Sequence, residues 1–372
     1  MPILSAMFPQ GPNLDAAATK AASALSNMNI SYAGPRMAQI LGDKKLGGQQ
    51  SLAIIGHRGS GKNKVIISGE APNTRPSVME NTIKSLVQAG ENGADFVEFD
   101  VQVTKDGHAV IFHDDHIIID NKGSYIARRI GDLTLEEYLS LGFQSDGLEI
   151  QMPLVRKASD GSICRWIVNV QDCLCTLKDA FEKIPLSVGF NIELKFDDEA
   201  EVPQADLQRV ISVVLREVEM YGKGRKVFYS SFHPDAVDLV RKMQAEFPVL
   251  FLTDGGTYIY KDERRNSIES AIRLCLQCGL QGIVSEVKAI LENPGLVSKV
   301  KDAGLCLLTY GELNNYVEAL QKQKEVNVDG VIVDHVLEIV TATQNDTSLS
   351  ITSPSSDKMS SRDLPGIVKA AA

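Results

Sequence analysis

Phe96-Val97-Glu98-Phe99-Asp100 is a short apolar segment that ends in two carboxylates, and the fold prediction starts from it. Its Val and Phe residues favour a strand, and a strand that is apolar on both faces is typical of a parallel sheet covered by helices. Side chains two positions apart on a strand point to the same face, so Glu98 and Asp100 lie side by side. The segment therefore predicts a buried parallel strand with an acidic carboxyl end.

Similar segments recur along the chain, and most of them are followed by a stretch with helical periodicity. Eight strands that alternate with helices fit either a closed barrel or an open, doubly wound sheet. Polar residues follow many of these strands, and in a closed barrel all the strand ends meet at one mouth. We therefore predict an α/β fold, a TIM (β/α)8 barrel. Its strands are expected at Leu52–Gly56, Phe96–Asp100, Gly189–Leu194, Val227–Ser230, Val249–Leu252, Gly282–Ser285, Cys306–Thr309 and Gly330–Val333. Its helices are expected at Glu80–Asn92, Asp206–Tyr221, Asp235–Glu246, Ser267–Cys278, Pro294–Asp302 and Asn314–Lys322.

A long segment, residues 101–176, separates the second predicted strand from the third. It begins with a predicted hairpin, in which Lys105-Asp106-Gly107 turns the chain between two short apolar runs. The remainder is charged and irregular, and we expect it to be a small insertion over the barrel mouth. The barrel domain should span residues 51–342, between a disordered extension at residues 1–50 and a disordered, Ser-rich tail at residues 343–372.

Composition limits the possible functions. The 372 residues, 44% of them hydrophobic, can bury one large core. A formal net charge of −10 argues against bulk binding of nucleic acid or anionic lipid, although a local group of cations can still bind a small phosphate ester. No apolar run reaches the length of a membrane span. Six cysteines without zinc-site spacing fit a reducing, intracellular compartment. We expect a soluble cytoplasmic protein, or a plastid or other organellar protein if residues 1–50 act as a transit peptide.

Charged residues at three strand ends predict a site for a metal ion and a phosphate. Glu98 and Asp100 would repel each other in a barrel mouth unless a cation lay between them. Glu193 and Lys195 share a face of the third strand in the same way, so Glu193 completes a set of three carboxylates. Carboxylate oxygens suit Mg²⁺ or Ca²⁺, and we predict one such ion here. Lys195 and Arg58, which follows the first strand, are predicted to contact the phosphate.

Two histidines are candidates for acid–base catalysis. His57 directly follows the first strand, and the glycines that flank it and Arg58 let a ligand approach closely. His113 ends the predicted hairpin, which would bring its imidazole over the second strand, opposite His57. Phosphodiester cleavage needs one group to accept a proton from the nucleophile and another to protonate the departing alkoxide. The two imidazoles are predicted to supply these groups.

Five dispersed motifs resemble, in order and rough spacing, the signature of the glycerophosphodiester phosphodiesterase family. They are His57-Arg58-Gly59, Glu80-Asn81-Thr82, Glu98-Phe99-Asp100-Val101, Phe112-His113-Asp114 and Ile192-Glu193-Leu194-Lys195. Further segments, such as Val331-Ile332-Val333-Asp334-His335, look like the eukaryotic intracellular branch, which includes plant and fungal glycerophosphocholine-type enzymes. The resemblance covers about residues 52–342.

The resemblance implies a phospholipase C-like phosphodiesterase barrel that hydrolyses glycerophosphodiesters, such as glycerophosphocholine, to sn-glycerol 3-phosphate and an alcohol. The site residues that it implies are His57 and His113 as acid and base, Glu98, Asp100 and Glu193 as ligands of one divalent ion, and Arg58, Lys195 and Glu80 as substrate contacts. Glu80 also stands three residues after Ser77, the spacing of a capping box, so we expect it to start the first helix as well.

The mechanistic hypothesis is that the ion acts as Lewis acid and template while one histidine deprotonates either the glycerol 2-hydroxyl or water. Two other functions stay open at this point. One is a lysophospholipase D-type activity on lysophospholipids, and the other is a non-catalytic regulatory protein that binds phosphate. The expected partner is a small glycerophosphodiester, without nucleic acid or stable membrane insertion. The sequence leaves the head-group alcohol, the choice of ion and the oligomeric state open.

Overall fold

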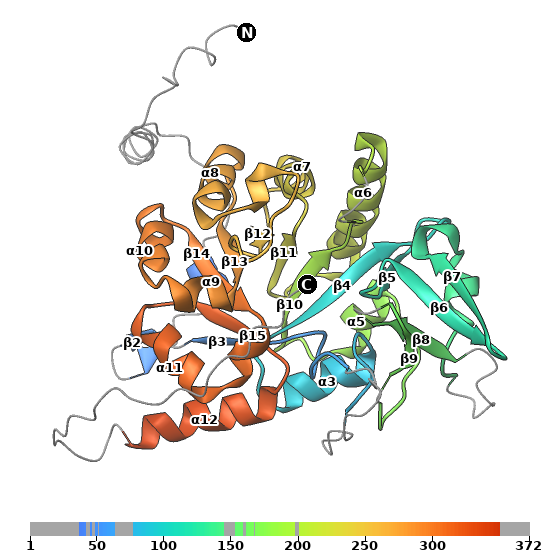
Figure 1. Ribbon diagram of the computed structural model, residues 1–372, viewed down its shortest axis with the longest axis horizontal. Coiled ribbons are helices and arrows are strands. Elements are labelled where there is room, and N and C mark those ends of the chain that lie inside the picture. Colours follow the sequence, from blue (N-terminus) through green and yellow to red (C-terminus); the bar gives the residue numbers. More distant parts are fainter. Residues whose placement is uncertain are drawn as a thin grey trace, which may run out of the picture.

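The computed structural model describes residues 37–41, 45–46, 49–50, 52–63, 77–144, 153–158, 161–166, 168–197 and 201–349 of the chain. Eight parallel strands close into a barrel, because β4 pairs with β3 on one side and with β10 on the other (Figure 1). The fold prediction is confirmed, and each barrel strand begins within one residue of its predicted start. The barrel strands are β3 (Ala53–Gly56), β4 (Phe96–Val103), β10 (Gly189–Leu194), β11 (Val227–Ser231), β12 (Val249–Thr253), β13 (Gly282–Glu286), β14 (Cys306–Tyr310) and β15 (Gly330–Val333).

Helices surround the barrel and cover the outer faces of its strands (Figure 1). Short 3-10 helices, η1 (Ile130–Asp132), η2 (Glu263–Arg265) and η3 (Glu312–Asn315), lie in three of the loops. The helices around the barrel are α3 (Ile83–Glu91), α5 (Leu177–Lys183), α6 (Gln204–Tyr221), α7 (Pro234–Met243), α8 (Ile268–Cys278), α9 (Val287–Glu292), α10 (Gly295–Asp302), α11 (Val317–Glu325) and α12 (Val336–Leu349).

The alternation of side chains along β4 divides the core into two layers. Val97 and Phe99 pack outward, in the large cluster between the strands and the helices. Phe96 packs inward, in a smaller cluster inside the barrel. A Cβ atom at Gly189 of the neighbouring strand would lie 2.2 Å from the Phe96 ring, so only glycine fits beside it. Because side chains alternate along a strand, the next two inward residues after Phe96 are Glu98 and Asp100, and both lie at the barrel mouth.

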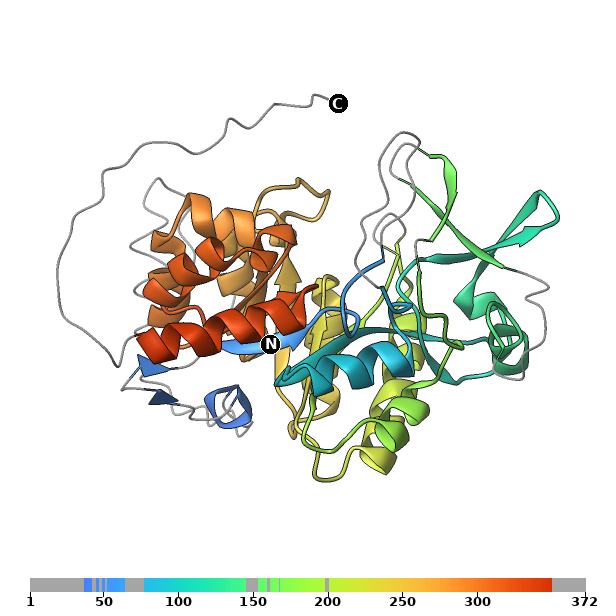
Figure 2. The ribbon, with the colours of Figure 1, turned by 90° about the horizontal axis from the view of Figure 1, so that it is seen from below.

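A short helix, α2 (Met37–Leu41), corrects the predicted boundary of the N-terminal extension. Met37 and Leu41 are buried against the cluster inside the barrel, and in Figure 2 the helix lies below the barrel strands. The expectation that residues 1–50 are all disordered is therefore wrong for this part, because its apolar side chains cover the barrel interior. Two short paired strands follow, β1 (Lys45–Leu46) and β2 (Gln49–Gln50). Residues 1–36, with the proposed transit peptide, lie outside the described residues.

The predicted boundary at residue 343 is also too early, because α12 continues to Leu349. The Thr343 hydroxyl donates to the carbonyl of Val340, one turn back, so this polar residue is accommodated within the helix. The expected tail after Leu349 lies outside the described residues.

The insertion after β4 is more regular than its sequence indicated. The predicted hairpin is confirmed, since β5 (Ala109–Ile111) pairs antiparallel with the end of β4. The remainder was expected to be irregular, but it forms a separate sheet beside the barrel, in the order β7-β6-β8-β9 (Figure 1). Alternating isoleucines of β6 enter a third apolar cluster, which explains the regularity. The elements are β6 (His116–Asn121), β7 (Ser124–Arg129), α4 (Leu135–Leu139), β8 (Leu154–Lys157) and β9 (Ile163–Arg165).

The buried side chains of α2 lead to a prediction about stability. Replacing both Met37 and Leu41 by Ala should lower the free energy of unfolding by about 2–5 kcal/mol, because each change removes apolar contacts inside the barrel. Chemical denaturation of the full chain measures this. The control is Gln39→Ala, at an exposed position of the same helix, which should change stability by less than about 0.5 kcal/mol. Equal stability of the double variant and the control would show that α2 does not contribute to the barrel.

Candidate active site

Three carboxylates meet at the carboxyl ends of two adjacent strands. Glu98 and Asp100 point inward from β4, and Glu193 points inward from β10, where it pairs with Asp100 in the strand register. One oxygen from each residue lies within 4.8 Å of one oxygen from each of the others. Parallel pairing in this register brings the two acidic motifs together, as the sequence predicted.

The surroundings of Glu98 fit a bound cation. Its carboxylate is buried, and one oxygen accepts a hydrogen bond from the backbone N–H of Arg58 at 2.8 Å. The other oxygen, Oε1, is buried and receives no hydrogen bond from any residue that the structure describes. Burial and the nearby carboxylates of Asp100 and Glu193 raise the pKa of Glu98 well above its usual value. A buried carboxylate oxygen without a donor is costly, and a divalent cation coordinated by all three residues would satisfy it.

Cations surround the same carboxylates. The ammonium of Lys195 lies 3.0 Å from a Glu193 oxygen and 3.8 Å from an Asp100 oxygen. The guanidinium of Arg58 lies 3.6 Å from the other Asp100 oxygen, which also accepts a 2.8 Å hydrogen bond from the side chain of Asn81. Burial alone would raise the pKa of Asp100, but His113 and these neighbours together outweigh it, and the pKa is lower than usual. Asp100 is therefore ionised while Glu98, whose pKa is raised, holds its proton more readily.

Arg58 and Asn81 both adopt the left-handed backbone conformation, which residues other than glycine rarely do, with φ of 49° and 56°. Hydrogen bonds hold each of them there. The Arg58 carbonyl accepts from the Asn81 N–H at 3.0 Å and from the Ser85 hydroxyl at 3.0 Å. This conformation directs the Arg58 N–H to Glu98 and its side chain to Glu80 and Asp100. Such strain is typical of functional sites, where the surrounding contacts maintain it.

His57 is held by a carboxylate that the sequence analysis did not assign to the site. Its Nδ1 lies 2.7 Å from an oxygen of Asp334, which directly follows β15. Asp334 also accepts hydrogen bonds from the Lys62 N–H at 2.9 Å and the Asn315 side chain at 3.1 Å. Burial opposes its ionisation, but His57 and these donors lower its pKa below the usual range. The segment Val331–His335 was noted only as a family resemblance, and the missed signal was an acid at the end of a strand.

His113 is held by a chain of ionic contacts that reaches into the insertion. Its Nδ1 lies 2.7 Å from Asp114, whose other oxygen accepts from Arg156 of β8 at 2.7 Å. Arg156 also donates to Glu80 at 2.7 Å and stacks on Trp166, with its guanidinium 4.1 Å from the ring centroid. Burial, together with the positive charges of Arg58 and Lys195, lowers the pKa of His113 well below its usual value. Sequence reasoning missed Arg156, because nothing in its local sequence distinguishes it from the other charges of the insertion.

Glu80 does not start the helix, so the capping-box prediction was wrong. The N-cap of α3 is Thr82, whose hydroxyl accepts from the N–H of Ser85. The Glu80 carboxylate instead accepts hydrogen bonds from Arg58, Arg156 and the backbone N–H of Asn63. Although burial opposes ionisation, the two arginines lower the pKa of Glu80 to about 2. Glu80 therefore anchors the two guanidinium groups beside the three carboxylates.

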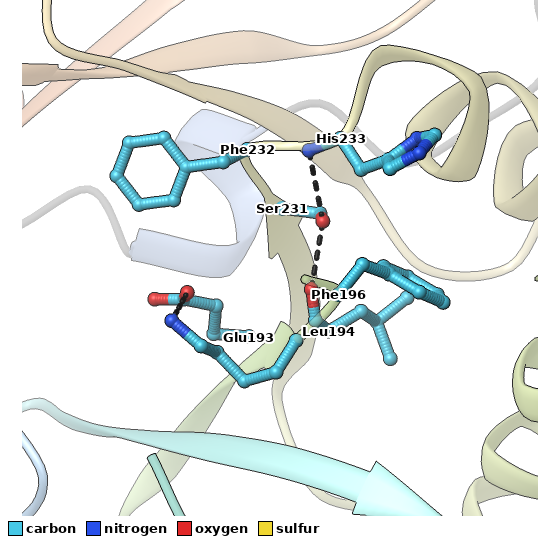
Figure 3. Close-up of a pocket in the computed structure, with 7 residues that line it drawn as sticks. Glu193, Leu194, Phe196, Ser231, Phe232 and His233 are labelled. Atoms are coloured by element: carbon cyan, nitrogen blue, oxygen red, sulfur yellow. Dashed lines mark hydrogen bonds and ion pairs between the residues drawn. The ribbon is translucent and has the colours of Figure 1, made fainter. Parts of the chain in front are cut away.

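A small pocket lies between β10 and β11, beside the metal-ligand candidates (Figure 3). The Glu193 carboxylate and the ring of Phe232 lie on one side of it, while Phe196 and His233 point the other way. Lys195 also lines the pocket, with its ammonium 3.0 Å from the Glu193 carboxylate. The Ser231 hydroxyl joins the two strand ends, since it donates to the Leu194 carbonyl at 2.7 Å and accepts from the His233 N–H at 3.2 Å. The pocket therefore has charged and aromatic groups side by side.

Comparison with known proteins agrees with this geometry. The model of the glycerophosphoryl diester phosphodiesterase family matches residues 57–338. The chain belongs to this family. It is therefore a glycerophosphodiester phosphodiesterase, an enzyme that hydrolyses glycerophosphodiesters, and the family prediction is confirmed.

Relatives and solved structures are consistent with that assignment. The phosphodiesterase is 48% identical to glycerophosphodiester phosphodiesterase GDPD2 of Arabidopsis thaliana over 292 residues, which cover 78% of this chain and 77% of that one. It is 33% identical to the glycerophosphocholine phosphodiesterase gde1 of Schizosaccharomyces pombe, over 79% of this chain and 28% of that one. Its fold matches an Oleispira antarctica phosphodiesterase in complex with sn-glycerol 3-phosphate, with a TM-score of 0.54, 22% identity, and 78% and 96% of the two chains covered.

The raised pKa values predict how the phosphodiesterase binds metal as pH changes. Burial raises the pKa of both Glu98 and Glu193, so the metal-free folded protein binds more protons than the unfolded chain, and its stability falls as pH rises through this range. A divalent cation replaces those protons. Stabilisation by Mg²⁺ or Ca²⁺ should therefore be small at about pH 5 and grow toward about pH 8, reaching about 2.7 kcal/mol at a hundredfold excess over Kd.

Thermal unfolding in chelator and in excess metal, repeated across this pH range, measures the effect. Glu98→Gln is the control, because it removes one ligand charge and should abolish most of the metal-induced shift. A shift that is independent of pH, or equal in wild type and Glu98→Gln, would contradict the assignment of the metal ligands.

The contacts of Arg156 lead to a second prediction. Arg156→Ala leaves the buried carboxylate of Glu80 and that of Asp114 without this partner, so it should cost about 3–5 kcal/mol of stability and reduce turnover. Arg165→Ala is a matched control in the adjacent strand β9, where the side chain is 74% exposed and lies 3.7 Å from Asp120. It should cost less than about 1 kcal/mol. Urea unfolding measures the stability of the two variants, and hydrolysis of glycerophosphocholine measures their turnover. Equal stability and equal turnover in Arg156→Ala and Arg165→Ala would show that Arg156 is not part of the site.

Proposed function

We propose that this phosphodiesterase hydrolyses glycerophosphocholine and related glycerophosphodiesters to sn-glycerol 3-phosphate and an alcohol, with His57 and His113 as the acid and the base. The observation that carries the proposal is that each imidazole is held at Nδ1 by its own carboxylate, Asp334 or Asp114, beside a group of three further carboxylates. The glycerophosphocholine phosphodiesterases among the relatives support this substrate.

Glu98, Asp100 and Glu193 are proposed to hold one divalent cation, Mg²⁺ or Ca²⁺, since three carboxylates provide the oxygen ligands that these ions prefer. Such an ion, when bound, polarises a phosphoryl oxygen and offsets the negative charge of the transition state. Arg58 and Lys195 flank the carboxylates from two sides, so both are positioned to contact phosphate oxygens of the substrate. Glu80 then acts by fixing the guanidinium of Arg58 rather than by touching the anionic phosphate.

The tautomers of the two histidines follow from their partners. A carboxylate can only accept, so the Nδ1 of each ring carries a hydrogen and the Nε2 is left for the substrate. His113, whose pKa is lowered, is neutral near pH 7 and suits the proton acceptor for the attacking hydroxyl or water. Asp334, whose pKa is lowered, stays ionised and stabilises a protonated His57, which then protonates the departing alkoxide.

We expect His57→Ala and His113→Ala each to reduce kcat for glycerophosphocholine on the order of 10²-fold or more, because each removes a proton-transfer group. The control is His116→Ala, an exposed histidine of β6 near His113, which should keep wild-type turnover. Release of choline measures activity, and unchanged thermal unfolding shows that each variant is folded. Near-normal turnover in both His57→Ala and His113→Ala would refute the assignment.

The proposed location is the cytoplasm, with a plastid as the alternative. A relative that is 47% identical over 78% of this chain and 80% of its own length is named chloroplastic, which supports the alternative. None of the helices in the described ranges is both long and apolar enough to cross a membrane.

A further inference from the structure

The barrel mouth has two chemically different halves. Arg58 and Lys195 lie at the ends of β3 and β10, beside the three carboxylates. Strands β12, β13 and β14 lie across the barrel from β4, because the sheet order runs from β10 through β11 to β15 and back to β3. Their carboxyl ends carry Asp254, Glu286 and Tyr310. One half of the mouth therefore combines two cations with the metal-ligand candidates, whereas the three strand ends of the other half carry two carboxylates and an aromatic ring.

Asp254 is fixed by two tyrosines. The Tyr310 hydroxyl donates to one of its oxygens at 2.5 Å, and the Tyr260 hydroxyl donates to the other. Glu286 accepts from the backbone N–H of Lys288 at 2.6 Å. Neither Asp254 nor Glu286 forms a salt bridge with a cationic side chain among the residues described by the structure. Arg265 is the nearby buried cation, and its guanidinium lies 3.5 Å from the centroid of the Tyr260 ring and 5.7 Å from that of the Phe232 ring. The two carboxylates and the one buried guanidinium sum to one negative charge, because Lys288, the other cation beside Glu286, is exposed to solvent.

An aromatic contact joins this half to the site described above. Phe232 lines the same pocket as Glu193 and Lys195, and its ring lies on the same side as the Glu193 carboxylate (Figure 3). Phe232 also packs edge-to-face on Tyr310, with 5.8 Å between ring centroids. Both rings lie on the cluster that fills the barrel interior, so they form part of the floor of the mouth. A substrate whose phosphate contacts Lys195 thus has Phe232 beside it and Asp254 beyond.

We propose that Phe232, Tyr310 and Asp254, with Glu286, form a subsite for a cationic head group, and that the enzyme selects choline or ethanolamine esters over neutral ones. The proposal rests on the proposed function, because it places the phosphate on the cationic half. An ammonium group is attracted to aromatic rings and to carboxylates, while a neutral polyol gains neither interaction. A zwitterionic diester matches both halves of the mouth, with its phosphate at Lys195 and its ammonium at Asp254.

The test compares glycerophosphocholine with its uncharged carbon isostere, the glycerophosphate ester of 3,3-dimethylbutanol. The two have the same shape, so the ratio of their kcat/KM values isolates the charge of the head group. In the wild type this ratio should be about tenfold or more. Asp254→Asn should lower it severalfold by slowing the charged substrate alone, and Phe232→Leu should act in the same direction. Asp262→Asn is the control, because this aspartate of the same loop pairs with Arg264 instead.

Each outcome decides a separate question. If the wild type cleaves both esters equally well, or if Asp254→Asn keeps the wild-type ratio, the subsite is wrong while the proposed function stands. If neither ester is cleaved, the proposed function itself fails. Should Asp254→Asn not fold, inhibition of the wild type by free choline and by 3,3-dimethylbutanol replaces it. Preferential inhibition by choline supports the subsite, and equal inhibition overturns it.

Discussion

Mutual repulsion among three buried carboxylates is the constraint on which the site depends. Glu98, Asp100 and Glu193 approach one another in a barrel mouth of low dielectric, where like charges interact strongly. The surrounding residues reduce that repulsion without removing it. Lys195 lies against Glu193, and the strained backbone of Arg58 directs an N–H to Glu98. One oxygen of Glu98 nevertheless has no donor within the described residues, so the polypeptide alone leaves the charge incompletely compensated. A cation bound by the three carboxylates would offset that residual charge.

The two histidines are oriented by different parts of the fold, although both are proposed to serve one reaction. His57 is fixed by Asp334, so the first and the last barrel strands cooperate to hold it. His113 is fixed through Asp114 by Arg156, which belongs to the insertion. The first arrangement depends on barrel closure, and the second depends on docking of the inserted sheet. The insertion therefore helps to orient His113, the proposed proton-transfer group, rather than only covering the mouth.

Features set by strand periodicity and by the convergence of strand ends could be predicted from the sequence, whereas individual ion pairs and hydrogen bonds between distant segments could not. The acidic pair on β4 was predictable because side chains repeat every two residues along a strand, and the pairing of β4 with β10 then brought Glu193 to it. Asp334 was missed because it lies far along the chain from His57, and only barrel closure joins them. Glu80 has the spacing of a capping box, but two buried arginines bind its carboxylate, and Thr82 caps the helix instead. The ion pairs of Glu80 with distant arginines therefore determine its position, rather than the local capping pattern.

The distribution of residues around the mouth separates chemistry from selectivity. The metal-ligand candidates lie on β4 and β10, and the proposed phosphate contacts directly follow β3 and β10, so the strand pairing fixes the positions of both. Asp254 follows β12, and its orientation comes from tyrosine hydroxyls at the end of β14 and in the loop after β12. Changes in those loops can alter the proposed head-group subsite without displacing the three carboxylates, because the two groups of residues contact each other through the side chain of Phe232. A barrel of this kind can therefore keep one hydrolytic centre while the alcohol it accepts changes.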